Sequence, residues 1–279
     1  MRMPQWTGGM SRYTKPATVR KKKKFRVVAF RSKAVVAPGK DLEDIARTCR
    51  NLRKPKSEQK TMCFSAPASF VTAGITGVVG IVALTRVNEP RELPLAATPL
   101  LFALQQGIEG LLWLNLPLAR DGSLAMALTV LYLFFAEAFW PSFAPIAVWL
   151  IEPNRHRRLL MVVCIGVGTS VGAYLLWWIL VHPHFATILD GHIVYITEYH
   201  HSDAVGLAYL AATGLPLLLS SQRIVVVLGA IVLAGVVAAY AFYWQAFISV
   251  WCFFAAAASV TILCHFEWSR RSRLRAAGV

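Results

Sequence analysis

The sequence predicts an all-α fold, a polytopic membrane bundle of about seven transmembrane helices, and three observations lead to this prediction. Apolar residues make up 56% of the 279 positions and nine residues are tryptophan, which is more than the core of a soluble domain needs. From residue 62 onward the chain holds seven long apolar runs and no lysine. Ten of the eleven arginines in this part fall in alternate gaps between the runs, as expected for a chain that crosses a bilayer repeatedly.

Each apolar run is long enough for a membrane-spanning helix, which needs about 20 residues at a rise of ~1.5 Å per residue. We expect the spans near residues 67–86, 93–116, 124–150, 159–181, 204–221, 223–243 and 245–266. Trp140-Pro141 and Pro145 interrupt the third span, and we expect a kink there. Glycines recur in the first and fourth spans, which predicts close contact between helices; they are Gly74, Gly77, Gly80, Gly166, Gly168 and Gly172.

The positive net charge of the chain lies in an N-terminal arm. Residues 1–61 hold 18 Lys and Arg against 4 Asp and Glu, whereas residues 62–279 hold 11 against 10. The arm has too few apolar residues to build a core, and we expect it to be disordered in isolation. Residues 62–279 form the predicted membrane domain. The partner that this division predicts is the lipid bilayer, and the basic arm is not a sign of nucleic-acid binding.

The arginines also predict an orientation in the plasma membrane. The gaps after the first, third, fifth and seventh spans carry ten arginines, and only Arg120 lies on the other side. By the positive-inside rule the C-terminus is cytoplasmic and the N-terminus of the membrane domain is outside. Export of the basic arm without a signal peptide conflicts with this orientation, and we therefore expect the working protein to begin at Met62. The alternatives are a cleaved transit peptide and a basic tail held at the cytoplasmic lipid surface.

Two carboxylates lie inside predicted spans, Glu109 in the second and Glu137 in the third. A charge at the bilayer centre costs about 2.5–3.5 kcal/mol on insertion scales, so such residues usually face a cavity or a partner. Gln105 lies one turn before Glu109 on the same helical face, and Trp113 continues that stripe. We predict a ligand-binding pocket formed by Gln105, Glu109 and Glu137. The other interpretation is a set of interhelical hydrogen bonds that fix packing, worth about 0.6 kcal/mol each.

The gap between the fourth and fifth spans holds five of the seven histidines, several acidic residues and no Lys or Arg. Such side chains suit zinc or copper; the candidate ligands are His182, His184, Glu198, His200, His201 and Asp203. Glu198 and His201 stand one helical turn apart if a helix begins near Tyr195, as in half of a carboxylate metal site. HExxH, His-x₃-His and CxxC motifs are absent, and solvated or capping histidines are the other interpretation. A pH-sensing role also fits.

Elemental mass spectrometry of the purified protein tests the metal hypothesis. Bound zinc or copper that disappears when His200, His201 and Asp203 are changed to Ala would support it. Absence of metal from both samples would reject it.

Four motifs, spaced in order, resemble an uncharacterised family of bacterial multi-pass membrane proteins whose members open with MCFSA. They are residues 62–66 (MCFSA), residues 91–97 (RELPLAA) leading to 105–110 (QQGIEG), residues 133–136 (LFFA) ahead of Trp140-Pro141, and residues 249–256 (SVWCFFAA). The resemblance covers the chain from Met62 onward. It implies a seven-helix membrane protein and carries no activity over to any position.

Three classes of function are consistent with these residues. The first is a transport or small-ligand-binding bundle that takes a small molecule or an ion into the carboxylate pocket. The second is a metal-dependent membrane hydrolase that uses the His/Asp/Glu cluster. Its comparison with ceramidase-like hydrolases is weakened because the last span lacks their His-x₃-His and offers only His265, so we lean away from an enzyme. The third is a structural or accessory subunit whose polar residues hold helices together.

Overall fold

The computed structural model describes residues 65–119, 122–189, 191–196, 203–243 and 246–276, apart from the side chains at 274 and 276. The predicted N-terminal arm lies outside the described residues. So do Arg120 and three of the predicted metal ligands, Glu198, His200 and His201.

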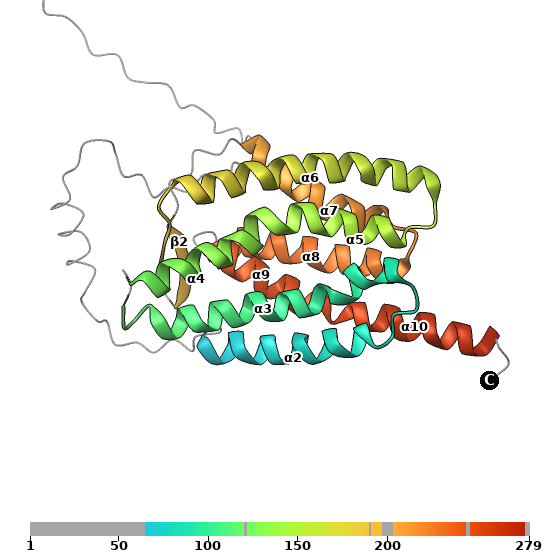
Figure 1. The fold of residues 1–279 in the computed structure, drawn as a ribbon, viewed down its shortest axis with the longest axis horizontal. Coiled ribbons are helices and arrows are strands. Elements are labelled where there is room, and N and C mark those ends of the chain that lie inside the picture. The colour runs from blue at the N-terminus through green and yellow to red at the C-terminus, as the bar shows by residue number, and fades with distance from the viewer. Residues whose placement is uncertain (1–64, 120–121, 190, 197–202, 244–245, 277–279) are drawn as a thin grey trace, which may run out of the picture.

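The described chain is a bundle of helices that run side by side along one long axis (Figure 1). The helices are α2 (Ala66–Leu84), α3 (Leu93–Asn115), α4 (Ser123–Leu133), α5 (Trp140–Ile151), α6 (Arg155–Val181), α7 (Asp203–Leu219), α8 (Arg223–Phe242), α9 (Phe247–Ser259) and α10 (Thr261–Ala276). A 3₁₀ turn, η1 (Pro90–Glu92), precedes α3, and a π-helical turn, η2 (Phe134–Phe139), joins α4 to α5. Strands β1 (Phe185–Leu189) and β2 (His192–Ile196) pair as an antiparallel hairpin. The all-α prediction is confirmed.

Six helical stretches among the described residues are long and apolar enough to cross a membrane. They are Ala66–Leu84, Pro90–Asn115, Ser123–Ile151, Arg155–Val181, Arg223–Phe242 and Phe247–Arg273, and they correspond to every predicted span except the fifth. The fifth is α7, which is apolar but only 17 residues long. At the helical rise it measures about 25 Å, at the lower end of the range for a span.

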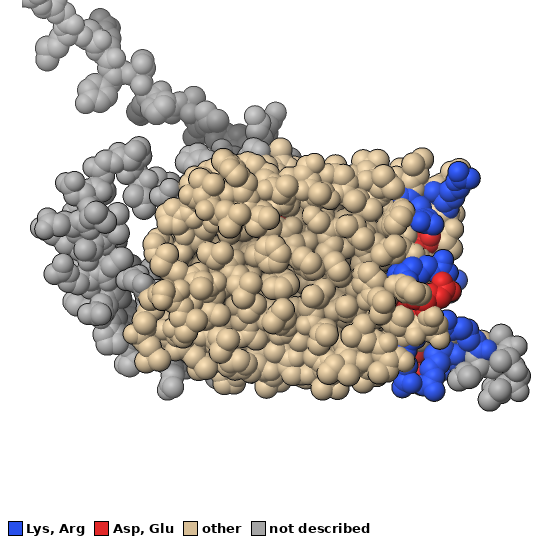
Figure 2. Space-filling model, viewed as in Figure 1, with Lys and Arg blue, Asp and Glu red and all other residues tan. Residues whose placement is uncertain are grey.

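The distribution of charge on the bundle is that of a membrane-embedded protein. Large apolar side chains are exposed along the helices; Val71, Val78, Leu159, Val163 and Val237 each have more than half of their surface accessible. Figure 2 shows the basic and acidic side chains gathered at one end of the molecule in this view. At this end α2 and α5 finish, α6 and α8 begin, and α10 extends beyond the other helices (Figure 1). We call it the arginine-rich end.

Polar contacts fasten the turns of the arginine-rich end to one another. Glu152, which is 2% exposed, accepts hydrogen bonds from the backbone amide and hydroxyl of Ser221, the hydroxyl of Ser220 and the amide of Asn154. Burial alone would raise the pKa of Glu152, but these hydrogen bonds outweigh it and hold the pKa below its ordinary value. The α5–α6 turn is thereby joined to the α7–α8 turn.

The interruption predicted in the third span takes the form of the π-helical turn η2, which ends just before Trp140. Pro141 has no N–H to donate to the carbonyl of Glu137, and its ring crowds that carbonyl. A wider turn before the proline accommodates both effects. The irregular backbone is covered by α6 and lies inside the bundle, as required where no water can satisfy its carbonyls.

Glycines in α6 allow this helix to approach the irregular segment closely. A Cβ atom at Gly168 would overlap the carbonyl oxygen of Pro141, and one at Gly172 would lie 2.5 Å from the carbonyl oxygen of Ala138. Gly166, two residues before Gly168, faces open space. The close contact predicted for this glycine series therefore involves Gly168 and Gly172, and Gly166 takes no part in it.

Changing Gly168 to Ala should lower the free energy of unfolding by about 1–3 kcal/mol, because the added methyl group is forced against the Pro141 carbonyl. Gly166→Ala is the matched control and should be neutral or stabilising by up to ~1 kcal/mol, since Ala favours the helix. Denaturant unfolding in mixed micelles measures both. Equal effects of the two substitutions would contradict the close contact.

Candidate functional site

A cluster of buried polar side chains lies between α3, α4 and α9. Its members are Gln105, Gln106 and Glu109 of α3, Tyr132 of α4 and Ser249 of α9, and each is at most 2% exposed. We call this group the polar cluster. On α3 these residues share one face because positions three and four apart lie on the same side of a helix. Polar residues at this depth are costly and mark a functional-site hypothesis by default.

Glu109 is joined to α9 by a short hydrogen bond, which the Ser249 hydroxyl donates to its Oε1 at 2.5 Å. Gln106 and Tyr132 lie close enough to interact electrostatically with the carboxyl group. Among the described residues the ion pairs are Arg86–Glu267 and Arg91–Glu89, both at the arginine-rich end. Within that part of the chain, Glu109 has no basic partner.

Several polar atoms around Glu109 make no hydrogen bond. They are both amide atoms of Gln106, Nε2 of Gln105 and the hydroxyl groups of Tyr132 and Tyr195. An unsatisfied buried polar atom costs about 1–3 kcal/mol, and native proteins contain few of them. Their concentration at one place means that the cluster is not optimised for stability.

The polar cluster adjoins a cavity through Gln105. The Oε1 atom of Gln105 accepts a hydrogen bond of 2.7 Å from Nε1 of Trp140 on α5. The Trp140 ring stacks on Phe102 with 4.0 Å between ring centroids, and both rings line the cavity. Cys252, one turn after Ser249 on α9, also lines it and interacts with Gln105 and Glu109.

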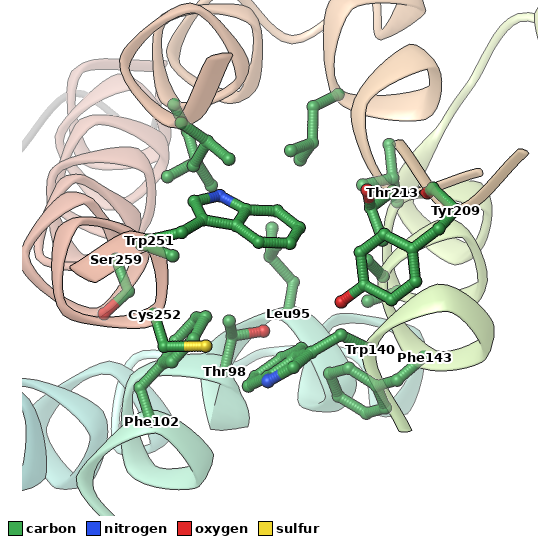
Figure 3. Close-up of a pocket in the computed structure, with 17 residues that line it drawn as sticks. Leu95, Thr98, Phe102, Trp140, Phe143, Tyr209, Thr213, Trp251, Cys252 and Ser259 are labelled. Atoms are coloured by element: carbon green, nitrogen blue, oxygen red, sulfur yellow. Dashed lines mark hydrogen bonds between the residues drawn. The ribbon is translucent and has the colours of Figure 1, made fainter. Parts of the chain in front are cut away.

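The cavity has a volume of about 80 Å³ and is lined by side chains of α3, α5, α7, α8 and α9. Figure 3 shows the rings of Trp140, Tyr209 and Trp251 surrounding it. Hydroxyl groups in the wall are already bonded within the protein: Tyr209 donates to the carbonyl of Ala136 at 2.6 Å, and Thr213 donates to the carbonyl of Tyr209 at 2.9 Å. The cavity therefore presents a mainly apolar surface to an occupant.

Residues 62–278 match the model of a family of unknown function, DUF6629. The chain belongs to this family. The matched range includes the polar cluster and the cavity. No curated protein and no solved structure matches the chain. What this DUF6629 protein can bind is therefore indicated by its own residues.

The three residues predicted to bind a ligand lie in two places in the DUF6629 fold. Gln105 and Glu109 belong to the polar cluster. Glu137, on the π-helical turn η2, is 8% exposed and interacts electrostatically with Tyr209 and Cys252. None of the three lines the cavity, although Gln105 accepts a hydrogen bond from Trp140, which does.

Three of the six predicted metal ligands can be placed. His182 stacks on Trp178 at 3.7 Å between centroids, and its Nδ1 lies 3.2 Å from the carbonyl oxygen of Trp178. His184 is 1% exposed, and burial lowers its pKa below the ordinary value. Asp203 is exposed at the start of α7. The described residues contain no group of three or more His, Cys, Asp or Glu arranged to hold a metal ion, and metal binding stays a prediction.

Sequence reasoning did not identify Ser249, Tyr132 and Cys252 as members of the site. Ser249 and Cys252 lie three residues apart in the last apolar run, a spacing that places both on one helical face. That spacing is the feature of the sequence that could have indicated their shared face. It could not indicate which helix they contact, because helical periodicity does not predict the tertiary fold.

The two adjacent glutamines should respond differently to substitution. Gln105→Leu should lower the free energy of unfolding by about 1–3 kcal/mol, because Nε1 of Trp140 loses its acceptor while it remains buried. Gln106→Leu removes two buried atoms that make no hydrogen bond in the structure and should cost less. Unfolding of both variants in the same detergent compares them. A cost for Gln106→Leu as large as that for Gln105→Leu would show that Gln106 is bonded after all.

Proposed function

We propose that this DUF6629 protein binds a small, mostly apolar molecule in the cavity between α3, α5, α7, α8 and α9. The observation that supports this proposal is a cavity in which the hydroxyl groups of the wall already donate hydrogen bonds to carbonyl oxygens of the protein. An apolar cavity of this kind stays dry, and an apolar molecule that fills it stabilises the protein. An occupant that needs many hydrogen bonds would find few unengaged partners in this wall.

The position of the polar cluster refines the class of ligand. Cys252 in the cavity wall interacts with Gln105, whose amide Nε2 makes no hydrogen bond. A ligand with one hydrogen-bond acceptor at the end of an apolar body would direct that group past Cys252 to this amide. Transport, which the sequence analysis grouped with ligand binding, would use the same site, since carriers bind their substrates near the membrane midplane.

Two other interpretations compete with ligand binding. A structural subunit would keep the polar cluster as a junction between α3 and α9, with the cavity empty. A metal-dependent hydrolase would use the residues after α6, of which Glu198, His200 and His201 lie outside the described part of the chain. We favour ligand binding because it gives a role both to the aromatic wall of the cavity and to the neighbouring polar cluster.

The proposed ligand should be recovered from purified protein. Small molecules extracted from wild type and identified by mass spectrometry should include one apolar species in near-stoichiometric amount. Ala255→Leu, which extends a wall residue of α9 into the cavity, should lose it. Ala257→Leu on the exposed side of the same helix is the matched control and should retain it. Equal recovery from both variants, or no bound species in wild type, would contradict the proposal.

We also propose that the arginine-rich end faces the cytoplasm of the cell and that the protein lies in the plasma membrane. The support is that ten arginines lie in or near three connections between helices and in the C-terminal helix, and that the basic side chains gather at one end of the molecule (Figure 2).

Reporter fusions test this orientation. Green fluorescent protein at the C-terminus should be fluorescent, and alkaline phosphatase at the same place should be inactive. Phosphatase fused after residue 119, in the connection between α3 and α4, should be active. The reverse result at both positions would overturn the proposed orientation.

A further inference from the structure

We propose that Glu109 is a proton-binding site inside the bundle, protonated at neutral pH and connected by Tyr132 and Tyr195 to the end opposite the arginines. This inference concerns the polar cluster alone and does not depend on a ligand in the cavity. Its three supports are the lack of a counter-charge, the count of donors and acceptors, and the arrangement of the two tyrosines.

The groups that face Glu109 are neutral at physiological pH. They are Tyr132 on α4, Tyr195 on β2 and Cys252 on α9, while α2, which packs along α3, contains no titratable side chain. A further acid, Glu137, also interacts with Cys252 and supplies no positive charge. An ionised, unpaired carboxylate would carry the full cost of burial, and binding a proton removes that cost.

One atom beside the carboxyl group is an acceptor without a donor, which a carboxyl proton would satisfy. Ser249 donates to Oε1 of Glu109, so a carboxyl proton on the other oxygen needs an acceptor. Oε1 of Gln106 is a buried acceptor that receives no hydrogen bond, and Gln106 lies beside the carboxyl group. A proton on Glu109 would supply the missing donor. An ionised Glu109 leaves that carbonyl oxygen unsatisfied.

Two stacked tyrosines extend from the polar cluster toward the hairpin. The rings of Tyr132 and Tyr195 are nearly parallel, with 4.7 Å between centroids and 6° between planes. Tyr195 belongs to β2, which lies at the end of the bundle away from the arginines (Figure 1). Glu109 is itself six residues before the end of α3 at Asn115, about 9 Å along the helix.

The hydroxyl groups of Tyr132 and Tyr195 make no hydrogen bond in this structure, so a proton would leave along them only when they move into contact with Glu109 and with each other. Glu109 gives its proton to the hydroxyl oxygen of Tyr132, which releases its own proton to the hydroxyl of Tyr195, which releases one to water. Each tyrosine gains one proton and loses one, so neither becomes charged, and Glu109 is left as a carboxylate.

Infrared spectroscopy in H₂O and D₂O tests the proposal with Glu109→Gln, Glu137→Gln and wild type in detergent. At neutral pH, wild type and Glu137→Gln should show the carbonyl stretch of a protonated carboxyl group, and Glu109→Gln should lack it. Raising the pH should remove the band. A spectrum of Glu137→Gln without the band at neutral pH overturns the proposal, and this result stands even if Glu109→Gln fails to fold.

Tyr132→Phe tests the connection separately. It should keep the carboxyl band and slow its shift on transfer to D₂O by tenfold or more, because the hydroxyl relay is broken. Tyr174→Phe, at an exposed position of α6, is the control and should exchange at the wild-type rate. Unchanged exchange in Tyr132→Phe would overturn the proposed connection.

Discussion

The absence of water from the membrane interior is the constraint on which the rest of this structure depends, because every buried polar group must find its partner within the protein. The helices satisfy their own backbones. The hydroxyl groups of Thr76, Thr129 and Thr213 donate to carbonyl oxygens one turn earlier in the same helix. Where a proline disrupts the backbone in the third span, α6 covers the irregular turn closely. The polar cluster around Glu109 departs from this rule, because several of the buried polar atoms described there make no hydrogen bond.

The polar cluster also connects to the cavity, the other part of the candidate site. The hydrogen bond from Ser249 to Glu109 joins α3 to α9, and one turn further along α9 Cys252 forms part of the cavity wall. On α3, Gln105 supports the Trp140 ring that closes the same cavity. A change of charge at Glu109 would therefore act on the two helices that shape the space for a ligand. Proton binding at Glu109 and ligand binding in the cavity would both involve this junction between α3 and α9.

The sequence predicted the helical membrane class and most of the helix positions because apolar length and arginine placement are local properties of the chain. It also predicted that Gln105 and Glu109 share a face, since they are four residues apart. Ser249 as the partner of Glu109 could not be predicted, because 140 residues separate them and a helical period says nothing about which helix lies opposite. The role of Glu152 could not be predicted for the same reason. In the sequence it resembles a solvated loop residue, and its partners Ser220 and Ser221 come from the distant α7–α8 turn.

A double-mutant cycle between Glu109 and Ser249 tests most directly whether this polar contact joins the two helices. The free energies of unfolding of wild type, Glu109→Ala, Ser249→Ala and the double variant would be measured in one detergent. We expect a coupling energy of about 1 kcal/mol, within the range found for interhelical hydrogen bonds in membranes, with the double variant less destabilised than the sum of the single ones. Additive effects, within the ~0.3–0.5 kcal/mol typical of independent sites, would contradict the account.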